Sequence, residues 1–178
     1  MTAPVVQLRR TGPEDFDALR RLFDHPAFAG WGGPSRLADD QLRAKYLGSR
    51  YPAVECFLVL VDQEAVGLAQ LHTADEVAGG AVDLPDGTAG ESGGLDLILL
   101  PWVRGRGVGR AVVAELVRRA QRERGWRRIT VDPDLGNRAG IRFWQAVGFR
   151  PEQTIGNDPG REPYVVMVWG GIVRGSDG

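Results

Sequence analysis

The chain is poor in cysteine and in long apolar stretches. Cys56 is the only cysteine among 178 residues, which excludes an internal disulfide and a cysteine-based metal cluster. The longest clean apolar run, residues 97–103, is far shorter than the ~20 residues that a membrane-spanning helix needs. The first ten residues lack the charged start and apolar stretch of a signal peptide. We therefore expect one soluble, cytoplasmic domain over residues 1–178, with residues 171–178 as a flexible tail and with no metal site.

Positive charge is absent from residues 51–103, which hold nine acidic residues and neither Lys nor Arg. Residues 104–150 then carry twelve Arg against four acidic residues, so the net charge of -1 conceals two opposed blocks. Arg replaces Lys almost throughout the chain, since Lys45 is the only lysine, but this replacement does not explain the segregation. The two blocks favour an anionic partner for one part of the surface and a cationic partner for another. The pI near 6.1 disfavours nucleic acid as that anionic partner.

Hydrophobic periodicity predicts a mixed α/β (α+β) domain with about seven strands in a central sheet flanked by about four helices. The strands are expected at residues 4–10, 54–61, 66–72, 95–100, 129–132, 149–155 and 164–169. The helices are expected at residues 11–24 and 37–47, from residue 109 up to Gly125, and at residues 137–147. Residues 73–94 hold six glycines and several acidic residues without periodicity, and predict a long acidic loop.

Three alternating glycines lie between the strand expected at 95–100 and the helix that follows it, in the segment RGRGVGR at 104–110. Glycine lets backbone N–H groups approach an anion closely, and a helix N-terminus adds its dipole. The flanking arginines supply positive charge, so the segment predicts a phosphate-bearing ligand. It lacks the Lys and hydroxyl of the G-x-x-x-x-G-K-Ser/Thr phosphate loop, and a G-x-G-x-x-G fingerprint from Gly105 would need glycine where Arg110 stands. Tight strand–helix packing explains one glycine better than three.

The pattern R-x-x-G-x-G, filled by Arg104, Gly107 and Gly109, resembles the phosphate loop of the GCN5-related N-acetyltransferase (GNAT) superfamily. The resemblance covers nearly the whole chain, because that superfamily continues with a helix, a strand and an Asn-led helix ending in Gly-Phe, here Asn137 through Phe149. It implies the GNAT fold and acetyl-CoA as co-substrate, with the pyrophosphate on the loop and the pantetheine arm beside residues 98–100. The residues it implies for acetyl-CoA are Ile98, Leu99, Leu100, Arg104, Gly105, Arg106, Gly107, Val108, Gly109, Arg110 and Asn137.

Four short patches resemble the aminoglycoside 6'-N-acetyltransferases within that superfamily. They are FAGWGG at 28–33, GLAQ at 67–70, GLD at 94–96, and Asp132-Pro133 followed by Asn137. The resemblance implies a polycationic acceptor, an aminoglycoside acetylated on its 6'-amino group as in antibiotic resistance. Its implied binding residues are Trp31, Gln70, Asp96 and Asp132. We expect no membrane or nucleic-acid partner, and either a monomer or a homodimer.

Asp96 is also singled out by physical reasoning, because it is the only charged residue in the apolar strand GGLDLILL. Period-2 alternation places it on one face with Ile98 and Leu100. An unpaired carboxylate there would be costly, so we expect a cationic ligand or a polar pocket, with pairing to an arginine as the alternative. Asp96 would orient the acceptor amine and accept its proton, while a backbone N–H near Leu99 would polarise the thioester carbonyl.

Other candidates have a structural interpretation beside the functional one. Asp132-Pro133 suits a turn before a helix, Trp31 suits a core plug, and Cys56 is expected in the core. His72 shares a strand face with Gln70 but would more commonly be a surface histidine.

The proton donor for the leaving thiolate is open at this stage. Many relatives carry Tyr seven residues after the Asn, where this chain has Trp144, whose indole cannot act as an acid. Either another hydroxyl such as Tyr164 serves, or the thiolate leaves unassisted, which is tolerable for a thiol of pKa about 8.5.

Two classes of alternative function also remain. The first is acetylation of another amine, on a siderophore lysine, a polyamine or a protein N-terminus. Relatives that acylate siderophore lysines carry His where this chain has Asp96, which counts against that acceptor. The second is a CoA-binding regulatory protein without catalysis, motivated by Trp144.

Overall fold

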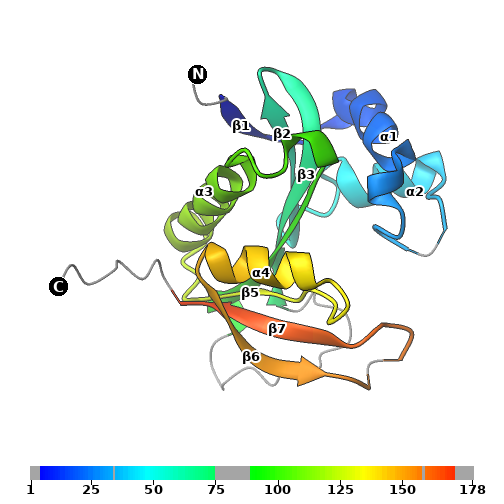
Figure 1. Cartoon of the computed structure of the whole chain (residues 1–178). Helices are drawn as coiled ribbons and strands as arrows, with labels where there is room; N and C mark the ends of the chain where they lie inside the picture. Colours follow the sequence, from blue (N-terminus) through cyan, green and yellow to red (C-terminus); the bar gives the residue numbers. More distant parts are fainter. Residues whose placement is uncertain (1–4, 34, 75–88, 158, 171–178) are drawn as a thin grey trace. The chain divides into compact units, whose positions relative to one another are not determined.

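A computed structural model describes residues 5–33, 35–74, 89–157 and 159–170. The elements are β1 (Val6–Arg10), α1 (Phe16–Asp24), α2 (Asp39–Tyr46), β2 (Val54–Val61), β3 (Glu64–Thr73), β4 (Ser92–Leu99), α3 (Val108–Arg122), β5 (Arg128–Val131), α4 (Arg138–Ala146), β6 (Phe149–Ile155) and β7 (Tyr164–Trp169) (Figure 1). Short 3-10 turns occur at Pro13–Asp15, Pro26–Phe28, Ala89–Glu91 and Pro101–Val103. Most of the predicted acidic loop and the predicted tail, residues 75–88 and 171–178, lie outside the described residues.

The seven strands form one sheet in the order β1-β2-β3-β4-β5-β7-β6. The pair β4–β5 is parallel, whereas β1–β2, β2–β3, β5–β7 and β6–β7 are antiparallel. This mixed sheet, with the four α-helices found in the described residues, confirms the predicted α/β (α+β) class. Within those residues, no helix has the length and apolar character needed to cross a membrane.

The chain forms two compact units. The first contains residues 1–72 and 96–116, and the second contains residues 73–95 and 117–178. The three boundaries all fall inside secondary-structure elements, one within β3, one within β4 and one within α3.

In the first unit, α1 and α2 supply the helical side of a hydrophobic core. Leu19 and Leu22 of α1 and Leu42 of α2 are almost completely buried with residues of β2 and β3 such as Leu58 and Leu68. Side-chain hydrogen bonds hold the turn before α1. The side chain of Asp15 accepts a hydrogen bond from the Gly12 N–H at 3.0 Å, whereas the Thr11 hydroxyl donates to the carbonyl of Tyr46 at 2.6 Å.

The β2–β3 hairpin is set by a two-residue turn at Asp62 and Gln63. Both residues have positive φ, 50° and 70°, which matches the right-handed twist of the flanking strands. Val61 therefore pairs with Glu64, and β3 begins two residues earlier than its apolar run predicts. Since side chains alternate along a strand, this register also fixes which residues of β3 share the face of Gln70 and His72.

In the second unit, β5, β7 and β6 are joined by antiparallel ladders between β5 and β7 and between β7 and β6. An aromatic row supports this sheet. The ring of Trp144 on α4 lies 5.2 Å from that of Phe149, and Phe149 lies 5.3 Å from Trp169, with the rings edge to face. Trp144 is therefore a core residue that packs α4 onto β6.

Gly67 on β3 allows a close approach to β4. A Cβ added at Gly67 would overlap the carbonyl oxygen of Ile98 and crowd the Cα of Leu99, both of which are backbone atoms that cannot turn aside. We expect Gly67→Ala to lower the free energy of unfolding by about 1–3 kcal/mol, a typical cost of overpacking. Urea denaturation measures this change. Gly156→Ala is the control, because an added Cβ there meets no atom within 4 Å; equal stability of the two variants would contradict the prediction.

Candidate active site

Asp96 lies on the face of β4 that is directed toward the core of the first unit. Leu100 belongs to that core and Ile98 packs against it. Because side chains alternate along a strand, Asp96 lies on the same face as Ile98 and Leu100, as the sequence predicts. Its side chain is 34% exposed, which leaves the carboxylate partly desolvated yet accessible.

The side chain that lies against Asp96 is the imidazole of His72 on β3. His72 Nε2 is 3.3 Å from Asp96 Oδ2, and the His72 side chain is only 14% exposed. The structure thus differs from the expectation of a surface histidine. His72 reaches the carboxylate because it follows Gln70 at strand spacing, on the same side of β3.

Gln70 and Cys56 form the buried part of the same region. Gln70 is 7% exposed and its Nε2 donates a hydrogen bond to Cys56 Sγ at 3.1 Å. Burial raises the pKa of Cys56 to about 11, so the thiol stays protonated and neutral at physiological pH. Cys56 is therefore a core residue, as predicted, and not a nucleophile.

Tyr46, at the end of α2, completes this region. Burial is the main cause of its raised pKa, and its neighbours Cys56 and Asp96 act in the same direction. The hydroxyl of Tyr46 is hydrogen-bonded to the Trp31 side chain, whose indole N–H can only donate. We call Tyr46, Cys56, Gln70, His72 and Asp96 the polar cluster.

Trp31 borders the polar cluster in the loop after α1. Its ring packs beside Phe28 at a centroid distance of 6.5 Å and is partly buried against the core. Lys45 Nζ holds the loop by donating to the carbonyl of Gly32 at 2.7 Å. Gly32 has a φ of 79°, and a Cβ there would press on the Tyr46 hydroxyl, which accounts for glycine at this position. Trp31 therefore combines core packing with a partly exposed ring.

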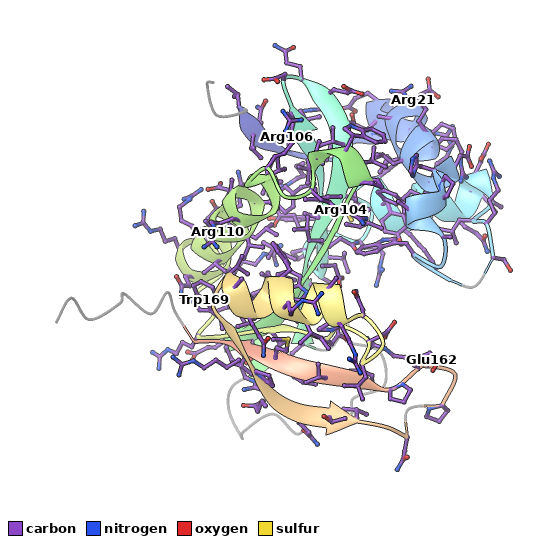
Figure 2. All side chains as sticks on the ribbon, in the orientation of Figure 1. Arg21, Arg104, Arg106, Arg110, Glu162 and Trp169 are labelled. Atoms are coloured by element: carbon purple, nitrogen blue, oxygen red, sulfur yellow. The ribbon has the colours of Figure 1, made fainter. Side chains whose placement is uncertain are left out.

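The glycine-rich segment 105–109 forms the start of α3 in the first unit. Gly105 and Gly107 have φ of 71° and 83°, and an added Cβ at either would meet no atom within 4 Å. Gly109 is the second residue of α3, and the N–H groups at the start of an α-helix lack an intrahelical carbonyl partner. Arg106 and Arg110 are exposed beside this turn (Figure 2). Open backbone, a helix N-terminus and two arginines together suit an anion such as a pyrophosphate.

Arg104 is hydrogen-bonded within the chain, and its contact with acetyl-CoA stays a prediction. Its Nε and Nη2 donate to the carbonyl of Leu99 at 2.9 and 2.7 Å, so the guanidinium is turned back to the end of β4. The Leu100 N–H donates to the carbonyl of Val66 on β3 at 2.8 Å. Because successive peptide groups of a strand alternate, the N–H and carbonyl of Leu99 face away from β3.

Asp132 lies in the second unit, where it is paired with Arg161. Arg161 Nη1 donates to Asp132 Oδ2 at 2.7 Å and Nη2 donates to the Asp132 carbonyl at 2.7 Å. The guanidinium also lies 3.7 Å from the centroid of Tyr164 and 3.8 Å from Asp134 Oδ1. The carboxylate predicted to bind substrate thus already has an internal cation.

Three other positions in the second unit that the sequence analysis considered have structural partners. Asn137 caps α4, since its Oδ1 accepts a hydrogen bond from the Gly140 N–H at 2.9 Å. Tyr164 is 1% exposed beneath Arg161, and Trp144 belongs to the aromatic row. Tyr164 and Trp144 therefore both have a packing role.

Sequence reasoning missed two residues of these regions. Tyr46 ends a helix and gives no pattern that separates it from other core aromatics. Arg161 stands in the turn before β7, 29 positions from Asp132, and only tertiary contact joins them. For His72, the sequence does indicate a place near the site, because His72 lies two positions after Gln70 on the same face of a strand, although a surface position is the commoner one for such a histidine.

Comparison with known proteins identifies the family of this chain. A sequence model described as an acetyltransferase (GNAT) domain matches residues 11–156, and the chain belongs to this family of acetyl-CoA-dependent N-acetyltransferases. No curated protein sequence matches the chain.

Among solved structures, AAC(6')-Ib in complex with paromomycin and acetyl-CoA is 25% identical, with a TM-score of 0.76 and 92% of each chain covered. A GCN5-related N-acetyltransferase from Kribbella flavida is 24% identical, with a TM-score of 0.69, and covers 92% of this chain and 96% of its own. A chimera of the Vibrio cholerae spermidine N-acetyltransferase SpeG and hSSAT is 17% identical, with a TM-score of 0.70 over 92% and 94% of the two chains. The last two similarities concern the fold alone.

Proposed function

We propose that this chain transfers the acetyl group of acetyl-CoA to an amine of a polycationic small molecule, with the 6'-amino group of an aminoglycoside as the leading acceptor. The observation that carries the proposal is the carboxylate of Asp96, partly exposed on an otherwise apolar strand face and held by His72. A carboxylate in this setting attracts an ammonium group and can accept its proton. The similarity to AAC(6')-Ib supports the same acceptor class.

The glycine-rich segment fits the pyrophosphate of acetyl-CoA. Backbone N–H groups of the first turn of α3, with Gly105 and Gly107 leaving open space, would bind its oxygens, and Arg106 and Arg110 would neutralise its charge. Arg104 takes a supporting role, since its hydrogen bonds to Leu99 fix the end of β4. Ile98, Leu99 and Leu100 would line the pantetheine arm, and Asn137 would contact it from the cap of α4.

Asp96 orients the acceptor amine and accepts its proton, while the Leu99 N–H, directed away from β3, donates to the thioester oxygen. The amine nitrogen bonds to the acetyl carbon as the carbon–sulfur bond breaks, and the departing thiolate takes one proton. Trp144 has no acidic proton to give and Tyr164 is buried, so we propose that the thiolate leaves unassisted and is protonated by water. Bound acetyl-CoA itself supplies the activated thioester.

The remaining acceptor contacts are assigned to Trp31, Gln70 and Asp132. The partly exposed ring of Trp31 suits the face of a sugar, and Gln70 adds a polar group beside Asp96. Asp132 would bind a second ammonium group only after displacing Arg161. Because Arg161 already neutralises Asp132, the structure also favours an alternative class of acceptor, amines with fewer cationic groups than an aminoglycoside, such as a short polyamine.

The first test is release of free thiol from acetyl-CoA in the presence of kanamycin-type aminoglycosides, polyamines and lysine. We expect turnover with the aminoglycosides, and a loss of at least about 100-fold in kcat in Asp96→Asn while acetyl-CoA still binds. Asp62→Asn is the matched control, because Asp62 lies in an exposed turn whose positive φ asparagine also adopts. Inactivity on every aminoglycoside with a 6'-amine refutes the leading acceptor, and full activity of Asp96→Asn refutes the base.

The second test concerns the anion site. Arg106→Gln and Arg110→Gln together should raise the Kd of acetyl-CoA about tenfold, the loss expected for hydrogen bonds to a charged group. Isothermal titration calorimetry measures this affinity directly. Arg21→Gln is the control, an exposed arginine on α1 (Figure 2). An unchanged Kd in the double variant would exclude these arginines from acetyl-CoA binding.

The third test asks whether Arg161 competes with the acceptor for Asp132. If it does, Arg161→Gln lowers the KM of a polycationic acceptor several-fold, and adding Asp132→Asn removes that gain. Arg128→Gln breaks a comparable arginine–carboxylate pair, with Glu152, and should leave KM unchanged. A KM that rises or stays constant in Arg161→Gln would show that Asp132 does not bind the acceptor.

A further inference from the structure

The pairing of His72 with Asp96 gives the proposed base a second titratable group. The two side chains come from neighbouring strands, β3 and β4, and their nearest atoms are 3.3 Å apart. The His72 side chain is 14% exposed and that of Asp96 is 34% exposed, so Asp96 is the more accessible of the two. A proton taken up by the carboxylate therefore has an imidazole within reach.

Other charged and titratable groups near the pair leave His72 as the proton acceptor at neutral pH. Cys56 on β2 and Tyr46 on α2 both have raised pKa values, and both remain protonated. Arg50, between α2 and β2, interacts with both groups and carries a permanent positive charge. His72 is the one member of the polar cluster whose ordinary titration range spans neutral pH.

Glu55 is the other acidic group on β2 that influences Cys56. It lies one position from Cys56 and so points to the opposite face of the strand, where it is ion-paired with Arg10. Asp96, by contrast, faces His72 directly.

We propose that His72 is a positioning residue that orients the Asp96 carboxylate and takes up the proton that Asp96 removes from the acceptor. This role rests on the proposed acetyl transfer. His72 Nε2 faces Asp96 Oδ2, so the imidazolium formed there would be stabilised by the same carboxylate.

The protons balance as follows. An acceptor ammonium loses one proton, through Asp96 to His72, and becomes the attacking amine. After the carbon–nitrogen bond forms and the carbon–sulfur bond breaks, the nitrogen loses a second proton and the thiolate gains one. His72 then releases its proton to solvent, so that each turnover yields an amide, a free thiol and one proton.

The first experiment is an NMR titration of the histidine Cε1–H signals, which the chain permits because it has only two histidines. His25→Gln and His72→Gln assign the two signals. We expect Asp96→Asn to lower the pH midpoint of His72 by about 1 pH unit, since a neighbouring negative charge is lost, and to leave His25 unchanged. Asp62→Asn should shift neither signal. An unmoved His72 midpoint in Asp96→Asn overturns the proposal without any reference to activity.

The second experiment is the pH profile of kcat. The amide of His72→Gln can still donate to Asp96 but cannot accept a proton, whereas His72→Leu can do neither. We expect His72→Gln to lower kcat about 10- to 100-fold with little change in KM. In the wild type, the acidic limb of the pH profile of kcat should have the same midpoint as the NMR titration of His72. In His72→Gln this limb should be displaced. His72→Leu should be slower still. Circular dichroism checks that both variants fold.

The outcomes separate the two proposals. An active wild type whose kcat and acidic limb are unchanged by His72→Gln overturns the role of His72 alone. A wild type that releases no thiol with any amine overturns the proposed acetyl transfer, and the role of His72 with it.

Discussion

A carboxylate on an apolar strand face is the constraint on which the candidate site depends. Partial removal of Asp96 from water is unfavourable unless a polar or cationic group compensates it. The chain meets this requirement with His72 from the next strand, and leaves about a third of the carboxylate exposed. The result is a carboxylate that is partly desolvated and still accessible, as the proposed role of a base requires.

The backbone around Asp96 is constrained by contacts of different kinds. Gly67 lets β3 and β4 approach closely, the Leu100 N–H bonds to Val66, and Arg104 holds the carbonyl of Leu99. These contacts fix the direction of the Leu99 peptide independently of any ligand. Arg104 therefore fixes the end of the strand from which the glycine-rich segment 105–109 departs.

The two charge blocks of the sequence are partly neutralised in three dimensions. Glu55, from the acidic block, pairs with Arg10, and Glu91 pairs with Arg127 from the basic block. Asp132, one of the few acidic residues of the basic block, pairs with Arg161. The segregation still bears on ligands at residues 104–110, where Arg106 and Arg110 stay exposed beside the helix N-terminus. The number of acidic residues in the sequence therefore overstates how many carboxylates can bind a cationic ligand, because several of them are already paired with arginines.

By itself, the sequence determined the strands and helices, the glycine-rich turn and the face of Asp96, because each follows from local periodicity and backbone geometry. It also carried the family resemblance, since the motif residues lie close together in the chain. Only the tertiary structure decided three contacts. His72 lies against Asp96, Arg104 donates to the carbonyl of Leu99, and Arg161 pairs with the carboxylate of Asp132. These contacts depend on the register of neighbouring strands and on the path of turns, which join residues distant in sequence. The physical reason is that a side chain's partner is set by three-dimensional packing, whereas its face on a strand is set by local alternation.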